Sequence, residues 1–375
     1  MPHLRRRTPL PPTEPHGHAR RLAAPGPGLS APGTAAATQP RDPAELRAAA
    51  LRWFAGHRRP LPGREIRDPW RVLVVEVMSQ QTQIERSLFR AEGFCEQFPA
   101  PDALARASVA DVVRAWAGLG YNRRALALRD AARVIVERHG GRVPSDLSAL
   151  VALPGVGPYT ARAVAARAHG VAIMPIDVNV RRVLSRLTGT ARPAAMQALG
   201  DAIAGAPPAT DTADAPSDTG AADPAGTAAG APPVSTGTPA PGPTAHPGDV
   251  ADTLMDLAAG VCHPRDPSCD ACPLRPWCAW HARPAAATPD PDGIACRPAR
   301  GRRREGSRVP FRETRRWLRG QLLRELREQR SGAWSSIEGD RGAHGHTAVR
   351  EVLATLVDEG FVELDERGRA RLAED

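Results

Sequence analysis

The chain of 375 residues contains no lysine, so all 50 of its basic residues are arginine. A mechanism that forms a Schiff base between a lysine amine and a substrate is therefore excluded. Aromatic residues make up only 4%, whereas there are 39 prolines and 34 glycines, which indicates that part of the chain is low-complexity spacer. The formal charge of +9 predicts attraction to a polyanion, and nucleic acid is the commonest one.

Long apolar runs are absent as well. No segment approaches the roughly 18 to 20 consecutive apolar residues that span a membrane, and no apolar signal core follows the N-terminal arginines. We therefore expect a cytoplasmic protein without a membrane partner. Cysteines are few, and four of the six lie between residues 262 and 278, a grouping that favours metal ligation over a disulfide scaffold.

Composition and helical periodicity divide the chain into folded and unfolded parts. Residues 1–41 are predicted to be a disordered basic tail, and residues 206–247, rich in Ala, Pro, Thr and Gly, a disordered insertion. The helical patterns in residues 42–205 and 248–281 are interpreted as one all-α domain whose core closes across the insertion. A linker follows at residues 282–307.

Residues 308–375 predict a small module in which helices precede a hairpin. Helical patterns cover residues 312–329 and 347–359, and the segments 361–364 and 369–372 have the pattern of two short strands joined by a glycine turn. This order of elements is typical of a winged-helix-like module. A helical cap with a frayed tail is the alternative.

Cys262, Cys269, Cys272 and Cys278 are separated by six, two and five residues. So short a segment can wrap four thiolates around one inorganic centre, and an iron-sulfur cluster is one such centre. Four cysteine ligands also suit a tetrahedral zinc ion, and the spacing alone leaves both possibilities open.

A glycine-rich turn lies between two helical patterns and consists of Leu153, Pro154, Gly155, Val156 and Gly157. Its glycines let the backbone amides at the start of the next helix approach a phosphate closely. A purely structural turn between helices is the alternative.

Asp177 directly precedes another helical pattern, where helix dipoles favour a carboxylate, although a plain N-cap is the ordinary role of such a residue. The stretch from the glycine-rich turn to this helix closely resembles the helix-hairpin-helix base-excision glycosylases. The resemblance implies that Asp177 stabilises a sugar cation, that Asn179 orients the site and that the hairpin binds DNA. It also implies a 4Fe-4S cluster on the four cysteines, because their spacing matches the iron-sulfur loop of that superfamily.

Glu76 lies in a strongly apolar helical pattern. A carboxyl group in such surroundings is expected to have a raised pKa, which suits a proton donor; a structural glutamate paired with arginine is the alternative. The stretch Glu76-Val-Met-Ser-Gln80-Gln-Thr-Gln83 is similar to the MutY-type A/G-specific adenine glycosylases. That similarity implies that Glu76 protonates adenine and that Gln80 and Gln81 form a wedge. We expect Glu76, Gln80 and Gln83 to share one helix face.

The segment from Gly118 to Arg124 also matches this family, which implies that Tyr121 enters the base stack beside the lesion; a buried aromatic is the alternative. A flipped base leaves a gap that this tyrosine and the two glutamines would fill. Tyr159 stands where bifunctional relatives of the endonuclease III type carry a catalytic lysine. We therefore expect hydrolysis without lysine-based lyase activity.

The sequence also departs from the family. Leu61-Pro-Gly63-Arg64 has glycine where the family has tryptophan, and Ser79 replaces an apolar residue, so the base pocket is expected to be larger or more polar. Arg64 remains and is expected to contact a base or a phosphate. Residues 308–375 look too short and too helical for the Nudix-like domain with which most relatives inspect 8-oxoguanine, so the opposite base would be read near the wedge or by the C-terminal module.

Together these observations predict a monomeric, nucleoid-associated bacterial enzyme of base-excision repair. We expect a monofunctional glycosylase that hydrolyses the N-glycosidic bond of adenine opposite 8-oxoguanine or guanine in double-stranded DNA. One alternative is a mismatch thymine (T:G) glycosylase, which shares the scaffold, the cluster and the tyrosine in place of lysine. The other is a non-catalytic iron-sulfur DNA-binding protein, which would suit the altered pocket and the C-terminal module.

Overall fold

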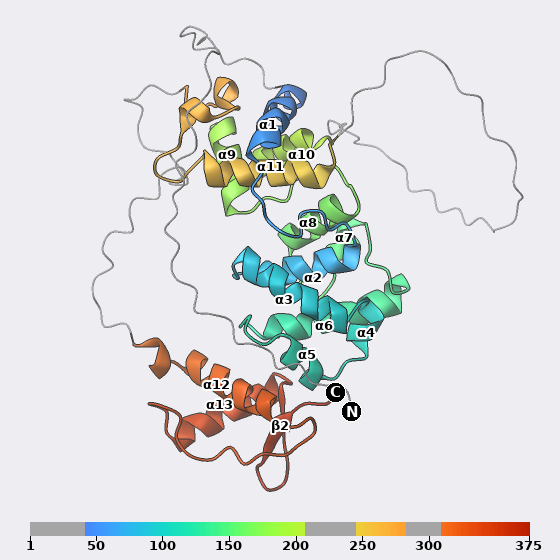
Figure 1. Cartoon of the computed structure of the whole chain (residues 1–375), viewed down its shortest axis with the longest axis vertical. Helices are drawn as coiled ribbons and strands as arrows, with labels where there is room; N and C mark the ends of the chain where they lie inside the picture. Colours follow the sequence, from blue (N-terminus) through green and yellow to red (C-terminus); the bar gives the residue numbers. More distant parts are fainter. Residues whose placement is uncertain (1–41, 207–244, 283–308) are drawn as a thin grey trace, which may run out of the picture. The chain divides into compact units, whose positions relative to one another are not determined.

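The computed structural model of the chain describes residues 42–206, 245–282 and 309–375. The predicted tail, and all but the ends of the predicted insertion and linker, lie outside the described residues. Those that are described belong to one compact unit and are mostly helical, with a single two-stranded hairpin among the described residues, which confirms the all-α prediction (Figure 1). No helix in these ranges has the length and apolar content to span a bilayer.

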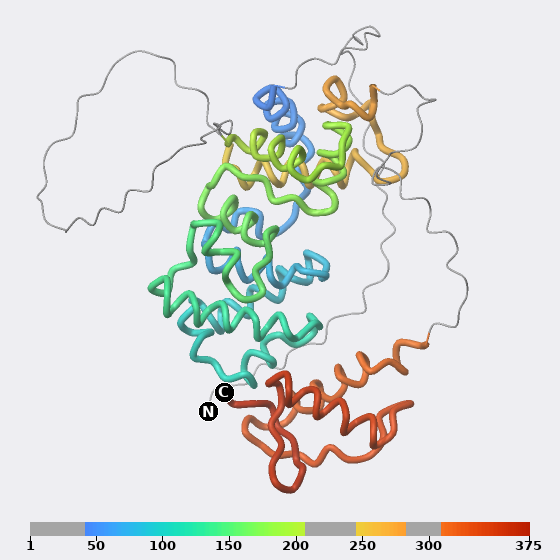
Figure 2. Tube along the Cα trace, turned by 180° about the vertical axis from the view of Figure 1, so that it is seen from behind, coloured from blue at the N-terminus to red at the C-terminus, as the bar shows by residue number. Residues whose placement is uncertain are grey.

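The first of three hydrophobic cores is formed mainly by the helices between residues 69 and 168. They are α2 (Pro69–Ser79), α3 (Ile84–Gln97), α4 (Pro101–Ala105), α5 (Val109–Ala115), α6 (Arg123–His139), α7 (Leu147–Val151) and α8 (Pro158–Ala168). At its centre the fully buried rings of Phe94 and Trp116 meet edge to face, with centroids 5.9 Å apart. α2 packs against both α3 and α8, as Figures 1 and 2 show, so its residues face a neighbouring helix on two sides.

The second core combines segments that are distant in sequence. It contains α1 (Pro43–His57), α9 (Val178–Thr188), α10 (Pro193–Ala204) and α11 (Pro247–Gly260). α11 packs against α1 and α9, and it also packs against α8 of the first core. Helices on both sides of the undescribed residues 207–244 therefore build one core, and α11 joins that core to the helix that follows the glycine-rich turn.

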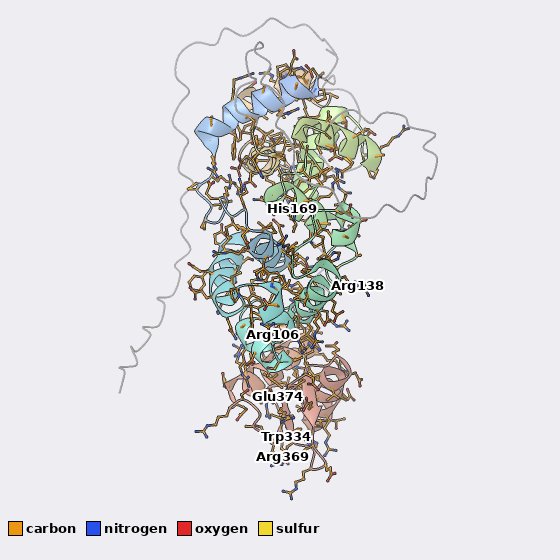
Figure 3. The ribbon with its side chains drawn as sticks, turned by 90° about the vertical axis from the view of Figure 1, so that its right-hand side faces the viewer. Arg106, Arg138, His169, Trp334, Arg369 and Glu374 are labelled. Carbon is orange, nitrogen blue, oxygen red and sulfur yellow. The ribbon has the colours of Figure 1, made fainter. Side chains whose placement is uncertain are left out.

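The third core belongs to the C-terminal module. α12 (Arg315–Glu328) and α13 (His346–Asp358) precede β1 (Val362–Leu364) and β2 (Ala370–Leu372), which pair antiparallel. This is the predicted order of elements, whereas the winged-helix-like name stays a prediction. The module also contacts α5, where the Ala110 N–H donates to the Ala373 carbonyl oxygen over 2.8 Å. Trp334, marked in Figure 3, lies 4.4 Å below the Arg371 guanidinium.

α2 is shorter than predicted. Asp68 caps its first turn by accepting a hydrogen bond from the Arg71 N–H over 2.8 Å, but the helix ends at Ser79. Gln80 has ψ of 114° and Gln81 has φ of 56°, so neither continues the helix. The prediction that Glu76, Gln80 and Gln83 share one helix face is therefore wrong. The polar run after Ser79 has no apolar face to bury, and tertiary contacts fix it as a turn.

Candidate active site

Glu76 lies near the C-terminal end of α2, and its side chain is 12% exposed. Burial is the main reason that the pKa of Glu76 is raised; the nearby Arg167 guanidinium opposes this effect, whereas Asp252 and Asp177 add to it. Arg167 Nε lies 3.5 Å from Glu76 Oε1, so the arginine neighbour of the alternative interpretation is also present. A carboxyl group in this setting keeps its proton at higher pH than an exposed one, as a proton donor requires.

Asp177 stands outside the first turn of α9 and caps it. Its Oδ1 accepts hydrogen bonds from the N–H groups of Asn179 (2.9 Å) and Val180 (2.7 Å), and its Oδ2 accepts one from Asn179 Nδ2 (2.8 Å). The alternative role as an N-cap is therefore present, and Asn179 contacts both carboxylate oxygens, whereas its role in orienting the site stays a prediction. Asp177 is partly exposed and close enough to Glu76 for its charge to act on that carboxyl.

Arg182 continues this chain of contacts toward the cysteine loop. Its Nη1 donates to Asn179 Oδ1 over 3.2 Å, its Nε to the Cys262 carbonyl oxygen over 2.8 Å and its Nη2 to the Ala258 carbonyl oxygen over 3.0 Å. Asp177, Asn179 and Arg182 thus connect the start of α9 with the end of α11.

The predicted wedge residues lie on two turns. Gln81 (φ 56°) and Tyr121 (φ 45°) are the non-glycine residues with positive φ in the part of the chain that the structure describes. A non-glycine residue with this left-handed backbone conformation destabilises the fold by about 1 to 3 kcal/mol. Such residues are found most often at functional sites. Both side chains are exposed, Tyr121 at 44%. Gln80 is half-buried, and its Nε2 lies 3.4 Å from the Gly155 carbonyl oxygen and 3.3 Å from Thr160 Oγ1, so it contacts the hairpin.

Arg124 holds these two turns together and was missed as a site residue. Its Nη1 donates to the carbonyl oxygens of Met78 (3.0 Å) and Gln80 (2.5 Å). The same guanidinium lies over the rings of Trp116 (5.5 Å) and Tyr121 (5.6 Å). Arg124 ends the sequence segment that matches the family, but no local pattern distinguishes a buried arginine that binds carbonyl groups from an exposed one.

The glycine-rich turn at residues 153–157 joins α7 to α8, as predicted. Gly155 has φ of 75°, and a Cβ there would lie 2.8 Å from the Cβ of Ala127, so glycine is required by both conformation and space. Leu153 and Val156 are buried in the first core and anchor the turn. The other three residues reach the surface at least in part, so the turn offers its backbone, and not these two side chains, to a ligand.

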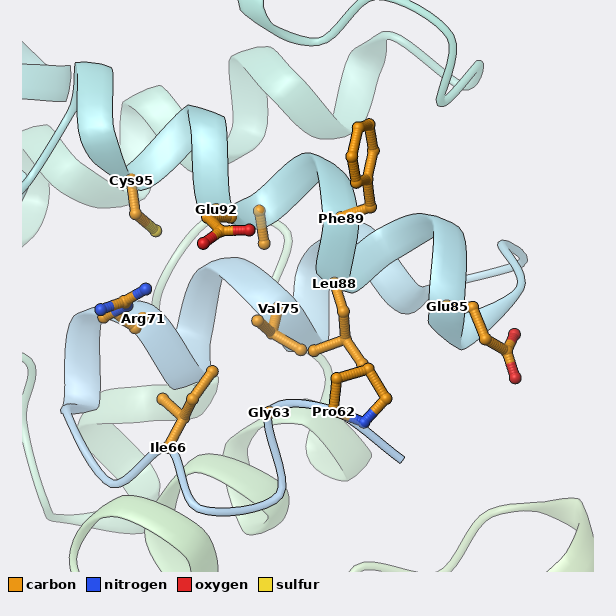
Figure 4. A pocket seen from close by; sticks show the side chains of 11 residues that line it. Pro62, Gly63, Ile66, Arg71, Val75, Glu85, Leu88, Phe89, Glu92 and Cys95 are labelled. Atoms are coloured by element: carbon orange, nitrogen blue, oxygen red, sulfur yellow. The ribbon is translucent and has the colours of Figure 1, made fainter. Parts of the chain in front are cut away.

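Gly63 has φ of 76°, and a Cβ there would lie 2.5 Å from Leu88 Cδ2. Figure 4 shows its loop against Leu88 of α3. The loop lines a cavity of about 350 Å³ together with Val75 of α2 and residues of α3, and Glu76 is not among the lining residues. This cavity therefore gives no support to the expectation that glycine at position 63 enlarges a pocket around Glu76.

Arg64 is 7% exposed and is bound to Asp256 of α11, with 2.8 Å from Nη1 to Oδ2 and 2.5 Å from Nη2 to Oδ1. Arg59 binds the same carboxylate through its Nε at 2.6 Å. Burial alone would raise the pKa of Asp256, but hydrogen bonds from Arg64 and Arg59 keep it below its usual range. Because Arg64 is buried and paired, its predicted contact with a base or phosphate would require this pair to open.

Arg167 and Asp252 form a second buried pair beside Glu76. Arg167 belongs to α8, whose C-cap residue His169 is labelled in Figure 3. Its Nη2 donates to Asp252 Oδ1 and its Nη1 to Asp252 Oδ2, the latter over 3.4 Å, and the Asp252 side chain is 3% exposed. Sequence reasoning missed this pair because its members are 85 residues apart and lie on helices from different cores.

The four cysteines of the predicted metal centre line one small cavity beside the second core. Burial raises the pKa of Cys272 to about 12 and also raises the pKa values of Cys269 and Cys278. Arg186 Nη1 lies 3.1 Å from Cys262 Sγ, which brings a positive charge to the loop. Within the described ranges, no three His, Cys, Asp or Glu side chains lie close enough together to hold a single metal ion.

The C-terminal module reaches the wedge. Arg316 of α12 lies 4.4 Å above the Tyr121 ring. Gln80, Gln81 and Tyr121 line a groove whose other residues include Arg315 and further arginines of α12. The predicted wedge is therefore bordered by basic side chains from two parts of the chain.

Comparison with known proteins agrees with this geometry. Residues 74–202 match the family described as HhH-GPD superfamily base excision DNA repair protein. An adenine DNA glycosylase of Mycobacterium tuberculosis is 39% identical over 327 residues, which cover 85% of this chain and 93% of that protein. The human adenine DNA glycosylase is 33% identical over 250 residues, which cover 64% of this chain and 40% of that protein. A thermostable thymine-DNA glycosylase has a similar fold, with a TM-score of 0.50 at 23% identity over 64% of this chain and 96% of that one.

The family match contains Glu76, Tyr121, the glycine-rich turn and Asp177, whereas the mycobacterial relative matches far beyond it. The chain therefore belongs to the adenine DNA glycosylases of the HhH-GPD superfamily of base-excision DNA repair proteins.

Proposed function

We propose that this chain, acting as a monomer, removes adenine that faces 8-oxoguanine or guanine in double-stranded DNA and leaves the strand uncleaved. The supporting observation is a pair of carboxyl groups in opposite settings. Glu76 is buried and has a raised pKa, whereas the carboxylate of Asp177 accepts three N–H hydrogen bonds at a helix start. Two carboxyl groups whose environments separate them in this way suit an acid and a stabilising anion.

The reaction uses both groups in one step. Adenine departs poorly as an anion, so Glu76 passes its proton to N7 while the bond between C1′ and N9 breaks and its electron pair stays on the purine. Adenine leaves neutral, and the Asp177 carboxylate stabilises the positive charge left on the sugar. Water then adds to C1′, and the proton it loses returns to the Glu76 carboxylate.

The flipped adenine leaves a gap in the duplex, and we propose that Gln80, Gln81 and Tyr121 fill it. The exposed amides of the glycine-rich turn would bind a backbone phosphate at the start of α8. The opposite base would be read near Tyr121, where the arginines of α12 border the groove. Strand cleavage by a lysine Schiff base is not possible for a chain without lysine.

A 4Fe-4S cluster fits the cysteine loop better than zinc. Cys262, Cys269, Cys272 and Cys278 would hold it, since they line one cavity and their spacing matches the iron-sulfur loop of this superfamily. The cluster would supply structural support for the loop. The raised pKa values mean that binding it would release thiol protons.

A base-release panel tests the proposed activity. Purified full-length protein would be incubated with duplexes that contain A:8-oxoguanine, A:G, T:G or U:G, and the freed base measured in single-turnover experiments. We expect fastest release of adenine from A:8-oxoguanine. Faster release of thymine or uracil would show the alternative glycosylase, and DNA binding without release from any duplex would show the non-catalytic alternative.

Metal analysis of the protein purified without oxygen tests the cofactor separately. We expect about four irons per chain with a broad visible absorption band. Replacement of Cys272 by Ser should remove the iron, whereas replacement of Cys95, which is buried in the first core, should not. Stoichiometric zinc without iron would contradict the proposal.

A further inference from the structure

The buried pair formed by Arg167 and Asp252 contacts the proposed acid. Arg167 uses both terminal nitrogens on Asp252 and has only its Nε directed at Glu76, at 3.5 Å. That Nε is buried and has no hydrogen-bond partner. Glu76 therefore has a cation beside it whose two terminal nitrogens are already bound to another carboxylate.

The titratable and charged groups that act on Glu76 come from α8, α11 and the start of α9. α8 supplies Arg167 and Tyr159, α11 supplies Asp252, and the residue that caps α9 is Asp177. Tyr159 is neutral at ordinary pH, because burial, followed by the charge of Glu76, raises its pKa well above the usual range. The charge that acts on Glu76 is thus one arginine against two aspartates.

Asp252 determines how strongly Arg167 stabilises the ionised form of Glu76. A guanidinium that faces a single carboxylate forms two parallel hydrogen bonds with it, and such a pair strongly favours the ionised carboxylate. Without Asp252, the two terminal nitrogens of Arg167 would be free to form that pair with Glu76. An acid held in this way could not bring a proton to the purine. Arg64 Nε also lies 3.9 Å from Asp252 Oδ2, but the terminal nitrogens of Arg64 are bound to Asp256. Arg64 therefore does not take the place of Arg167 as the partner of Asp252.

We propose that Asp252 and Arg167 are positioning residues for Glu76. Asp252 withholds the guanidinium from a two-bond pairing, so that Glu76 keeps its proton until adenine is bound, and Arg167 then stabilises the carboxylate that remains after the proton moves to N7. This inference rests on the proposed role of Glu76 and adds two residues that act through it. Neither of them needs to touch the substrate.

α8 contains a matched control. Arg162, five residues before Arg167, pairs with Asp201 of α10, and both arginine side chains are 16% exposed. Five residues correspond to a turn of about 140° around a helix, so Arg162 lies on another face of α8. Loss of this pair should affect folding in the same way as loss of the other pair, without any effect on Glu76.

The test is the pH dependence of single-turnover adenine release from A:8-oxoguanine by full-length Asp252→Asn, Arg167→Met and Asp201→Asn proteins. One neighbouring charge typically moves a carboxyl pKa by about 1 to 3 units, so Asp252→Asn should be about tenfold or more slower at pH 8 and should recover as the pH falls. Arg167→Met should show the opposite displacement, with activity retained to higher pH and a lower plateau. Asp201→Asn should melt at a lower temperature with the wild-type pH profile.

The double variant Arg167→Met/Asp252→Leu guards against misfolding of a single variant, because apolar replacement of a buried ion pair is often tolerated. Its pH limit should lie between those of the single variants. An unshifted limit in Asp252→Asn, a limit of the double variant outside the range of the two single variants, or shifts of Asp252→Asn and Arg167→Met in the same direction would overturn the inference. If Glu76→Gln were fully active, the proposed acid would be wrong; an inactive Glu76→Gln with unshifted limits would refute only the positioning pair.

Discussion

Glu76 and Asp177 are two carboxyl groups of one site that meet the backbone in different ways. Glu76 lies inside α2, where the helix already uses the backbone N–H groups, so its carboxyl group is buried beside Arg167 and Asp252 and has no backbone donor of its own helix to accept from. Asp177 lies one residue outside α9, where unused N–H groups point at it. Position relative to a helix end is therefore enough to give two carboxyl groups of one site opposite environments, as the proposed acid and stabilising anion require.

Glu76→Gln removes the proposed proton donor and should have the largest effect on the rate of adenine release. The amide keeps the shape of the side chain but has no proton to give, so single-turnover adenine release should fall by about 10²- to 10⁴-fold. Affinity for the A:8-oxoguanine duplex, measured by fluorescence anisotropy, should change little. A variant with more than a tenth of the wild-type rate would contradict the assignment.

Asp177→Asn removes the proposed stabilising charge and should have the next largest effect on the rate of adenine release. Asparagine caps a helix about as well as aspartate, so the melting temperature should stay close to wild type. Loss of the charge that faces the sugar should slow base release by about 10²- to 10³-fold. Asp177→Ala provides the control, because it removes the cap as well and should also destabilise the fold by about 1 kcal/mol.

Arg124→Met leaves both carboxyl groups in place and tests whether they depend on the wedge. The carbonyl oxygens of Met78 and Gln80 would lose their half-buried donor, at a cost of about 1 kcal/mol or more in unfolding free energy. We expect weaker binding of mismatched DNA, because the turns of Gln81 and Tyr121 lose their common support. Arg123→Met, at the largely exposed neighbour, should have little effect on the unfolding free energy. Equal effects of the two substitutions would exclude a specific role for Arg124.

The smallest expected effect is on stability as a function of pH. Because folding raises the pKa of Glu76, the protonated form favours the folded state, so its contribution is full below the ordinary glutamate pKa and is lost as the pH rises through the folded value. Glu76→Gln should therefore be more stable than wild type at high pH and equal to it at low pH, as measured by urea unfolding at several pH values. The reverse trend would mean that Arg167 outweighs burial.

Much of this site could be predicted because its determinants are local in sequence. The apolar run around Glu76 predicts that its carboxyl group is buried. The position of Asp177 before a helix predicts an N-cap, and Gly155 predicts a turn with positive φ. What could not be predicted depends on contacts between distant segments. Arg124 shapes the turn after Ser79, and Asp252 meets Arg167 only because α11 packs on α8. No periodicity or spacing contains that information.

The three bonds of Arg182 have a consequence for how this enzyme would fail in a cell. Because that guanidinium joins Asn179 to the carbonyl groups of Ala258 and Cys262, displacement of the cysteine loop would also displace a residue that holds the Asp177 carboxylate. If this loop holds the proposed cluster, loss of iron is expected to lower adenine release before it lowers the amount of folded protein.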